Sequence, residues 1–189
     1  TSESESPEPQ KKETIEEQVP FPSKPIIPRN VKLTVATILL IALGAGLFYT
    51  KSSLDKQNAL VSEGHSLLKE NKLSAAEAMF KKAQEASDKD PQVYAGLGEI
   101  FFRKNQFVKA VNHFRKSIEL NPSESSFHLK LSKTLSAMGQ LREAKRTYQL
   151  VIDIDPTNSQ AFFGLGKIQM KENNLEKAAT NLIMAIKLN

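Results

Sequence analysis

The stretch YAGLGEIFFRKNQFVKAVNHFRKSIELNP, residues 94–122, decides the fold. Small residues, Gly98 and Ala110, occupy positions at which two helices can cross closely, because a larger side chain would force the backbones apart. Pro122 follows Leu-Asn, where a residue without a backbone N–H ends the second helix. We therefore expect two antiparallel helices here, near residues 91–104 and 108–120.

The same pattern recurs along the chain at a shift of 34 residues. Gly64, Gly98, Ser132 and Gly166 coincide at this shift, and so do an alanine series, an aromatic series and the pair of prolines at 122 and 156. Four repeats are in register without an insertion, which is typical of stacked helical units. The remaining helices are expected near residues 57–70, 74–87, 125–138, 142–154, 159–172 and 176–188.

This period and residue pattern resemble the tetratricopeptide repeat (TPR) family. The resemblance implies an all-α fold, a right-handed α-solenoid of four helix pairs over residues 57–189, with repeats at about 57–90, 91–124, 125–158 and 159–189. The first repeat departs most, since its terminal proline is displaced to Pro91. The residues expected to pack within and between the repeats are Gly64, Ala76, Phe80, Tyr94, Gly98, Ala110, Phe114, Ala144, Tyr148, Gly166 and Ala178.

The N-terminal part of the chain has a different composition. Residues 1–30 hold six of the nine prolines and six glutamates, with few apolar side chains, which favours a disordered tail. Leu33 to Thr50 is a run of 18 residues without a charge, flanked by Lys32 and Lys51, and its length predicts a single transmembrane helix. Residues 51–56 are then a juxtamembrane linker. A buried core helix and a cleaved signal peptide are the competing interpretations.

The charges beside the apolar run indicate its orientation only weakly. Lys24, Arg29 and Lys32 precede it and Lys51 and Lys56 follow it, which slightly favours a repeat domain on the non-cytoplasmic side. The chain starts with a threonine and stops one residue short of its next repeat turn, so we expect a segment of a longer protein. Without a polar capping helix, Leu182, Ile183 and Ile186 should be partly exposed and could serve self-association.

In a solenoid of this kind the first helices of successive repeats line a concave groove. Helical periodicity predicts a mixed apolar and basic groove suited to a protein segment with apolar and acidic side chains. The alternative is that the lysines form a solvated face and that the phenylalanines are half-buried packing residues. The groove residues predicted are Val61, His65, Leu68, Gln92, Glu99, Phe102, Arg103, Leu129, Lys130, Lys133, Phe163, Lys167, Met170 and Lys171.

The resemblance also suggests one specific ligand, the C-terminal carboxylate of heat-shock chaperones. Co-chaperones of the family hold it with a clamp of lysine and asparagine side chains on first helices. The corresponding positions here are Val61, His65 and Gly96, and only Lys130 fits the clamp. Chaperone-tail binding is therefore not predicted.

Other function classes lack the residues that they require. The basic residues are scattered and carry no interleaved aromatic stripe, so no nucleic-acid partner is expected. His65, His113 and His128 fall in three repeats without metal-ligand spacing, and Asp153 with Asp155 precede a proline in a turn pattern. No catalytic residue, cofactor or metal is predicted.

These features predict a non-enzymatic membrane protein that recruits or holds partner proteins, as a scaffold or assembly factor of a larger complex. An alternative is a targeting receptor that captures precursor or secreted proteins for translocation. A third reading, an enzyme subunit whose activity lies in a missing part of the chain, stays open.

Overall fold

A computed structural model describes residues 29–189 of the chain. The chain divides into two compact units, Thr1–Gly46 and Leu47–Asn189, and each is described by itself. The tail predicted for residues 1–30 lies outside the described residues, except for its last two.

The described part of the first unit is helical and belongs to α1 (Arg29–Lys69). The apolar side chains of Ile38, Leu40, Ile41 and Leu43 are exposed there. In the part of the chain that the structure describes, no helix meets the length and apolarity required of a membrane span. The predicted transmembrane helix over residues 33–50 is therefore not supported by the structure.

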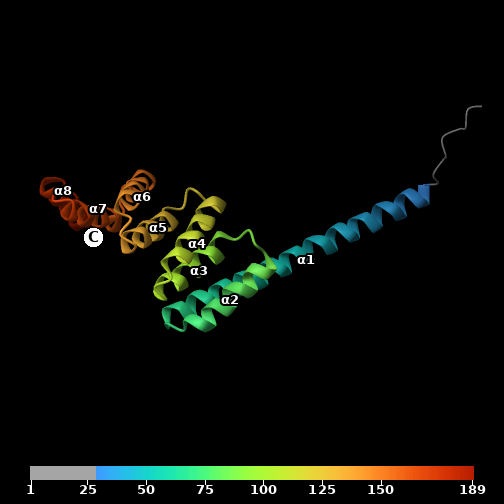
Figure 1. The fold of residues 1–189 in the computed structure, drawn as a ribbon. Coiled ribbons are helices and arrows are strands. Elements are labelled where there is room, and N and C mark those ends of the chain that lie inside the picture. The colour runs from blue at the N-terminus through green and yellow to red at the C-terminus, as the bar shows by residue number, and fades with distance from the viewer. Residues whose placement is uncertain (1–28) are drawn as a thin grey trace, which may run out of the picture. The chain divides into compact units, whose positions relative to one another are not determined.

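The second unit consists of antiparallel helices in successive pairs (Figure 1). Each helix predicted within residues 73–189 is present, and its ends lie within one residue of the expected positions. The helices are α2 (Leu73–Ala86), α3 (Pro91–Arg103), α4 (Phe107–Leu120), α5 (Ser125–Ala137), α6 (Leu141–Ile154), α7 (Ser159–Lys171) and α8 (Leu175–Lys187).

The start of the first repeat is the exception to this agreement. The sequence predicts a helix from residue 57 after a linker, whereas α1 runs through residues 51–56 without a break. Asp90, Glu124 and Asn158 cap the first helices of the later repeats by accepting a hydrogen bond from a backbone N–H. The equivalent position of the first repeat is Lys56, whose side chain cannot accept such a bond. Nothing therefore separates the repeat helix from the residues before it.

Buried aromatic side chains join each repeat to the next. The ring of Phe80 is fully buried between two first-helix glycines: a Cβ built on Gly64 would lie 2.8 Å from its Cζ atom, and one on Gly96 would lie 2.3 Å from it. Phe114 lies equally close to Gly98. The small residues predicted at the crossing points are thus confirmed, because they make room for the aromatic rings of second helices.

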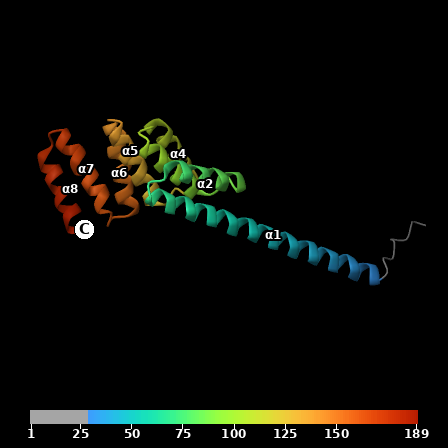
Figure 2. The same ribbon diagram turned by 90° about the horizontal axis from the view of Figure 1, so that it is seen from below.

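All predicted packing residues are buried, and the hydrophobic core of the stack contains two clusters. One cluster joins α1, α2 and α3, and the other joins α4 to α7. Figure 2 shows the last two pairs, α5 with α6 and α7 with α8, side by side. The all-α solenoid is therefore confirmed.

The turn inside each repeat has one residue in the left-handed region. These residues are Asn71, Asn105, Gly139 and Asn173, with φ between 57° and 77°, and they are 34 positions apart. Glycine and asparagine tolerate this backbone conformation better than other residues. The turns therefore repeat with the same register as the helices.

Asn105→Ala is expected to lower the free energy of unfolding by about 1 kcal/mol, because a Cβ without a local polar group is strained at positive φ. Asn105→Gly is the matched control and should change the stability by only a few tenths of that amount. Chemical denaturation followed by circular dichroism measures both. Equal losses in the two variants would show that the amide side chain, not the backbone conformation, matters at this turn.

The last helix exposes part of its apolar face. Ile183 and Ile186 of α8 have 53% and 77% of their surfaces exposed, and Leu182 is half-buried. The predicted exposure of this face is confirmed. Self-association through it stays a prediction.

Candidate protein-binding groove

The first helices of the repeats form one continuous face of the second unit. α3 contacts α5 and α5 contacts α7, while α4 and α6 each pack against their own partner helix and the first helix of the next repeat. Side chains from stretches of sequence about 34 residues apart therefore lie on a common surface. The predicted groove residues are distributed over this face, over the core beneath it and over the surface beside it.

Two of the predicted groove residues belong to the hydrophobic core. Val61 and Leu68 have 9% and 4% of their surfaces exposed and pack in the cluster that contains Phe80 and Val93. Together with Gly64 they recur at helical spacing on the side of α1 that faces α2 and α3. Their prediction as partner contacts is corrected: they are packing residues.

Phe102 and Leu129 are also packed against the core, although they remain partly exposed. Gln92 and Met170 are exposed on α3 and α7. Neither of these two lines the hollow that the groove forms between α5 and α7.

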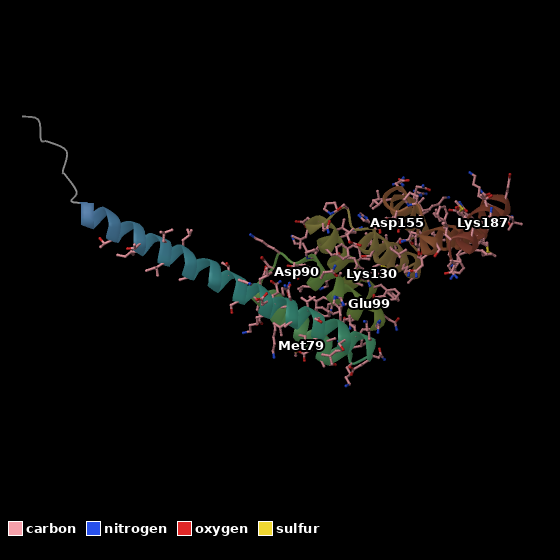
Figure 3. The ribbon with its side chains drawn as sticks, turned by 180° about the vertical axis from the view of Figure 1, so that it is seen from behind. Met79, Asp90, Glu99, Lys130, Asp155 and Lys187 are labelled. Carbon is pink, nitrogen blue, oxygen red and sulfur yellow. The ribbon has the colours of Figure 1, made fainter. Side chains whose placement is uncertain are left out.

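A charged clasp links the first three repeats. Glu99 accepts hydrogen bonds from Arg103 Nε and Lys130 Nζ, both at 2.9 Å, and Figure 3 shows Glu99 and Lys130 side by side. Arg103 also donates to the backbone carbonyl of Leu68, 2.7 Å away. Burial raises the pKa of the Glu99 carboxyl, but the two cations outweigh it, so the pKa lies below its ordinary value. We call Glu99, Arg103 and Lys130 the clasp.

The clasp changes the interpretation of its two cations. The sequence predicts that Lys130 and Arg103 attract an acidic partner, yet both already pair with the carboxylate of Glu99, and the three side chains together keep only one net positive charge. A partner carboxylate would have to compete with an internal ion pair, which reduces the gain from binding. These residues therefore hold neighbouring repeats together.

Each histidine makes a packing contact. His65 meets the ring of Phe80 edge-on at 5.1 Å, and His113 stacks on Phe101 at the same distance. His128 is buried, and its Nε2 lies 2.8 Å from the carbonyl oxygen of Pro122. Because a carbonyl only accepts, this nitrogen carries the proton and donates it. The three rings therefore serve structure.

The two half-buried histidines predict a pH dependence of stability. Burial lowers the pKa of His65 and His113 below the ordinary value of about 6.5, and Lys130 lowers that of His65 further, whereas Glu99 and Glu77 oppose the shifts. The unfolded chain then binds more protons than the folded chain in acid. The stability that the two neutral histidines contribute should be fully present above pH 6.5, and the free energy of unfolding should decrease as the pH falls below this value.

Denaturation at several pH values checks this expectation. The variant His65→Gln with His113→Gln should show a flatter profile between about pH 6.5 and 5.5. Acidic groups do not mask this window, because the carboxyl pKa values of Glu77 and Glu99 are lowered from 4.5. An unchanged slope in the double variant would assign the pH dependence to other groups.

The groove is hollowed between the last two repeats. The hollow has a volume of about 650 Å³ and contains four of the predicted residues, Lys133, Phe163, Lys167 and Lys171. We call it the basic pocket. The other residues that line it are Ser136, Ala137, Leu141, Tyr148, Gln160, Gly164 and Ile168.

One glycine allows two walls of the basic pocket to pack closely against each other. A Cβ built on Gly164 would lie 2.3 Å from the Cζ atom of Tyr148, so the tyrosine of α6 can approach the backbone of α7. Gly96 has the same relation to Phe80. Both glycines precede a glycine of the repeat pattern by two positions, a signal that the sequence contains and that the sequence analysis missed.

Comparison with known proteins identifies the repeats. Models of the tetratricopeptide repeat match residues 91–124 and residues 125–158, which are the second and third predicted repeats. The chain contains tetratricopeptide repeats. No curated protein sequence matches it.

Solved tetratricopeptide structures share the fold at low sequence identity. A crystal structure of MamA has a TM-score of 0.66 at 18% identity, with 86% of this chain and 95% of that chain covered. The first TPR domain of Spaghetti (RPAP3), bound to the HSP90 peptide SRMEEVD, has a TM-score of 0.61 at 24% identity, with 63% and 94% covered. A mutant O-GlcNAc transferase from Thermobaculum terrenum has a TM-score of 0.60 at 20% identity, with 62% and 22% covered. These likenesses establish the fold alone.

Proposed function

We propose that this tetratricopeptide-repeat protein is a non-enzymatic scaffold that holds a partner protein on the face formed by its first helices. Tetratricopeptide repeats are interaction modules, and the observation that carries the proposal is the basic pocket, an open hollow on that face. It combines an apolar floor with lysine side chains, whereas Lys130 is already paired within the clasp. The first TPR domain of Spaghetti (RPAP3), which was solved with a bound HSP90 peptide, supports the proposal that such repeats hold a segment of another protein.

Cross-linking in the native cell tests this function. The chain would be purified after treatment with a lysine-reactive cross-linker, and the cross-linked peptides would be sequenced by mass spectrometry. A scaffold should retain one or a few proteins at fixed stoichiometry, with cross-links at Lys167 or Lys171. A targeting receptor should instead bind many precursors weakly and in a salt-sensitive way. Recovery of no protein above the background of an unrelated chain would contradict the proposal.

Partner retention, measured without the cross-linker, is compared with that of a charge-reversal variant, Lys167→Glu with Lys171→Glu. Lys130→Glu is unsuitable as a binding test, because it would also place a carboxylate beside Glu99 and break the clasp. Retention of the partner by the variant would move the binding surface away from the basic pocket.

The membrane attachment is a separate part of the proposal, and it rests on the sequence of residues 33–50. Eighteen residues without a charge, flanked by lysines, match the length of a bilayer-spanning helix. Extraction of native membranes with alkaline carbonate tests it, and protease digestion of sealed vesicles reports which side the repeats face. Release of the chain into the soluble fraction would contradict attachment through these residues.

A further inference from the structure

The basic side chains of the groove fall into two groups, which differ in whether an acidic side chain pairs with them. The first group is Arg103 and Lys130, which share the carboxylate of Glu99. The second group is the three lysines of the basic pocket, which has no acidic side chain among its lining residues. The electrostatic field of the groove is therefore concentrated between α5 and α7.

The partners of the pocket lysines are neutral. Lys133 Nζ donates to the amide oxygen of Gln160 at 2.6 Å, and Lys167 Nζ lies 5.5 Å from the centre of the Phe163 ring. Among the residues that the structure describes, neither these two lysines nor Lys171 forms an ion pair. Burial and the charge of Lys130 lower the pKa of Lys133, a cost that a bound carboxylate would relieve.

The same pocket offers an apolar surface. Phe163 has 51% of its surface exposed, and Tyr148 and Ile168 line the hollow beside it. A volume of about 650 Å³ lies within the range of pockets that enclose small ligands, so it accommodates one large side chain with its neighbouring backbone. An apolar or aromatic anchor within a pocket is a common arrangement of interaction hot spots.

We propose that the basic pocket binds a segment of a partner protein in which one large apolar side chain is flanked by glutamates or aspartates. This inference deepens the proposed function and rests on it. The apolar side chain packs on Phe163, and the flanking carboxylates pair with Lys133, Lys167 and Lys171. The site lies in the third and fourth repeats, and Lys130 of the clasp precedes the pocket residue Lys133 by three positions on α5.

The number of exposed aromatic rings favours this occupant over a nucleic acid. Single-stranded nucleic acids are held by several aromatic platforms along a basic groove, and each platform stacks one base. The basic pocket has one exposed phenylalanine, Phe163, while Tyr148 is buried.

Peptide titrations on the whole chain test the proposal. The probes are short fluorescent peptides in which a single phenylalanine, leucine or methionine stands between two pairs of glutamates. Matched peptides carry glutamine in place of glutamate, or alanine in place of the apolar residue. At least one acidic peptide should bind, and its glutamine counterpart should bind about tenfold more weakly or worse, as expected when charge pairs are lost. The alanine counterpart should be weakened similarly.

The variant Lys133→Gln, Lys167→Gln, Lys171→Gln should lose about tenfold or more in affinity. Its control removes the same charge elsewhere, at the exposed lysines Lys82, Lys177 and Lys187, and should change the affinity by less than about twofold. Circular dichroism confirms that both triple variants are folded. Titration with an oligouridine RNA is run in parallel.

The outcomes separate this inference from the proposed function. Binding of none of the acidic peptides, equal binding of the glutamine peptides, or equal losses in the two triple variants would overturn the inference. Tighter binding of the RNA through the same lysines would overturn it too. A native partner that cross-links to the chain yet ignores these substitutions would leave the scaffold function standing. Peptide binding without any native partner would contradict the scaffold function alone.

Discussion

Gly96→Leu is expected to lower the free energy of unfolding of the repeat domain by about 3 kcal/mol. A Cβ at this position would lie 2.3 Å from Phe80 Cζ, and the ring cannot move away because Gly64 closes its other side at 2.8 Å. Relief of glycine's conformational entropy in a helix returns only about 1 kcal/mol. The steric clash therefore outweighs the entropic gain, so the variant is destabilised. Urea denaturation measures the loss in the free energy of unfolding.

A control and a second-site change isolate the cause. Gly46→Leu makes the same substitution where a Cβ would meet nothing within 4 Å, so it should leave the unfolding of the repeats unchanged. Phe80→Leu combined with Gly96→Leu should recover part of the loss, because the smaller side chain frees space. Additive losses in the double variant would show that the ring and the glycine do not interact as described.

Phe114→Ala is expected to cost about 3–5 kcal/mol, since it removes a fully buried aromatic side chain and leaves a cavity. The ring fills the space above Gly98 and belongs to the cluster that continues into the next repeats. Thermal or chemical denaturation should reveal the loss throughout the repeat domain. The domain is of ordinary size, so this cost is a large part of its total stability.

Phe163→Ala is the matched control for this second prediction. Its side chain is 51% exposed in the basic pocket, so its removal should change stability by less than about 1 kcal/mol. Affinity for the acidic peptides should fall instead. Similar stability losses in the two variants would contradict the division between packing and binding residues.

The helix pairs could be predicted from the sequence because the same physical requirement recurs every 34 residues. Gly98 and Ala110 have no alternative role once Phe114 must fit between helices. The left-handed turn residue at Asn105 follows the same register, as do the caps at Asp90 and its equivalents. Because the same packing requirement returns in every repeat, the same type of residue returns at the equivalent position, and this recurrence is visible in one sequence.

The start of α1 was not predictable from the repeat pattern alone. The register marks where a repeat helix should begin, but a helix ends only where its backbone groups find other partners. Lys56 occupies the capping position without an acceptor. The helix therefore continues through this position. The difference becomes visible only beside Asp90, Glu124 and Asn158, which cap the later repeats.

The groove was predicted only in part, because surface and core alternate within a few residues of a helix. Val61 and Leu68 were assigned to the groove by counting positions, yet the side of α1 that carries them packs on α2 and α3. The pairing of Glu99 with Lys130 joins residues 31 positions apart, and side-chain geometry decides it. The basic pocket likewise includes Leu141, which lies on a second helix, whereas the groove was predicted from first helices alone.

Photo-cross-linking of an acidic peptide tests the central claim most directly, namely that the first helices of the last two repeats form the recognition surface. A benzophenone in place of the apolar side chain would be activated on the bound complex, and the modified residues located by mass spectrometry. Modification is expected in α5 and α7, around Phe163 and Ser136. Modification mainly in α4 or α8, or at Glu99 and Arg103 of α3, would show that the peptide binds elsewhere.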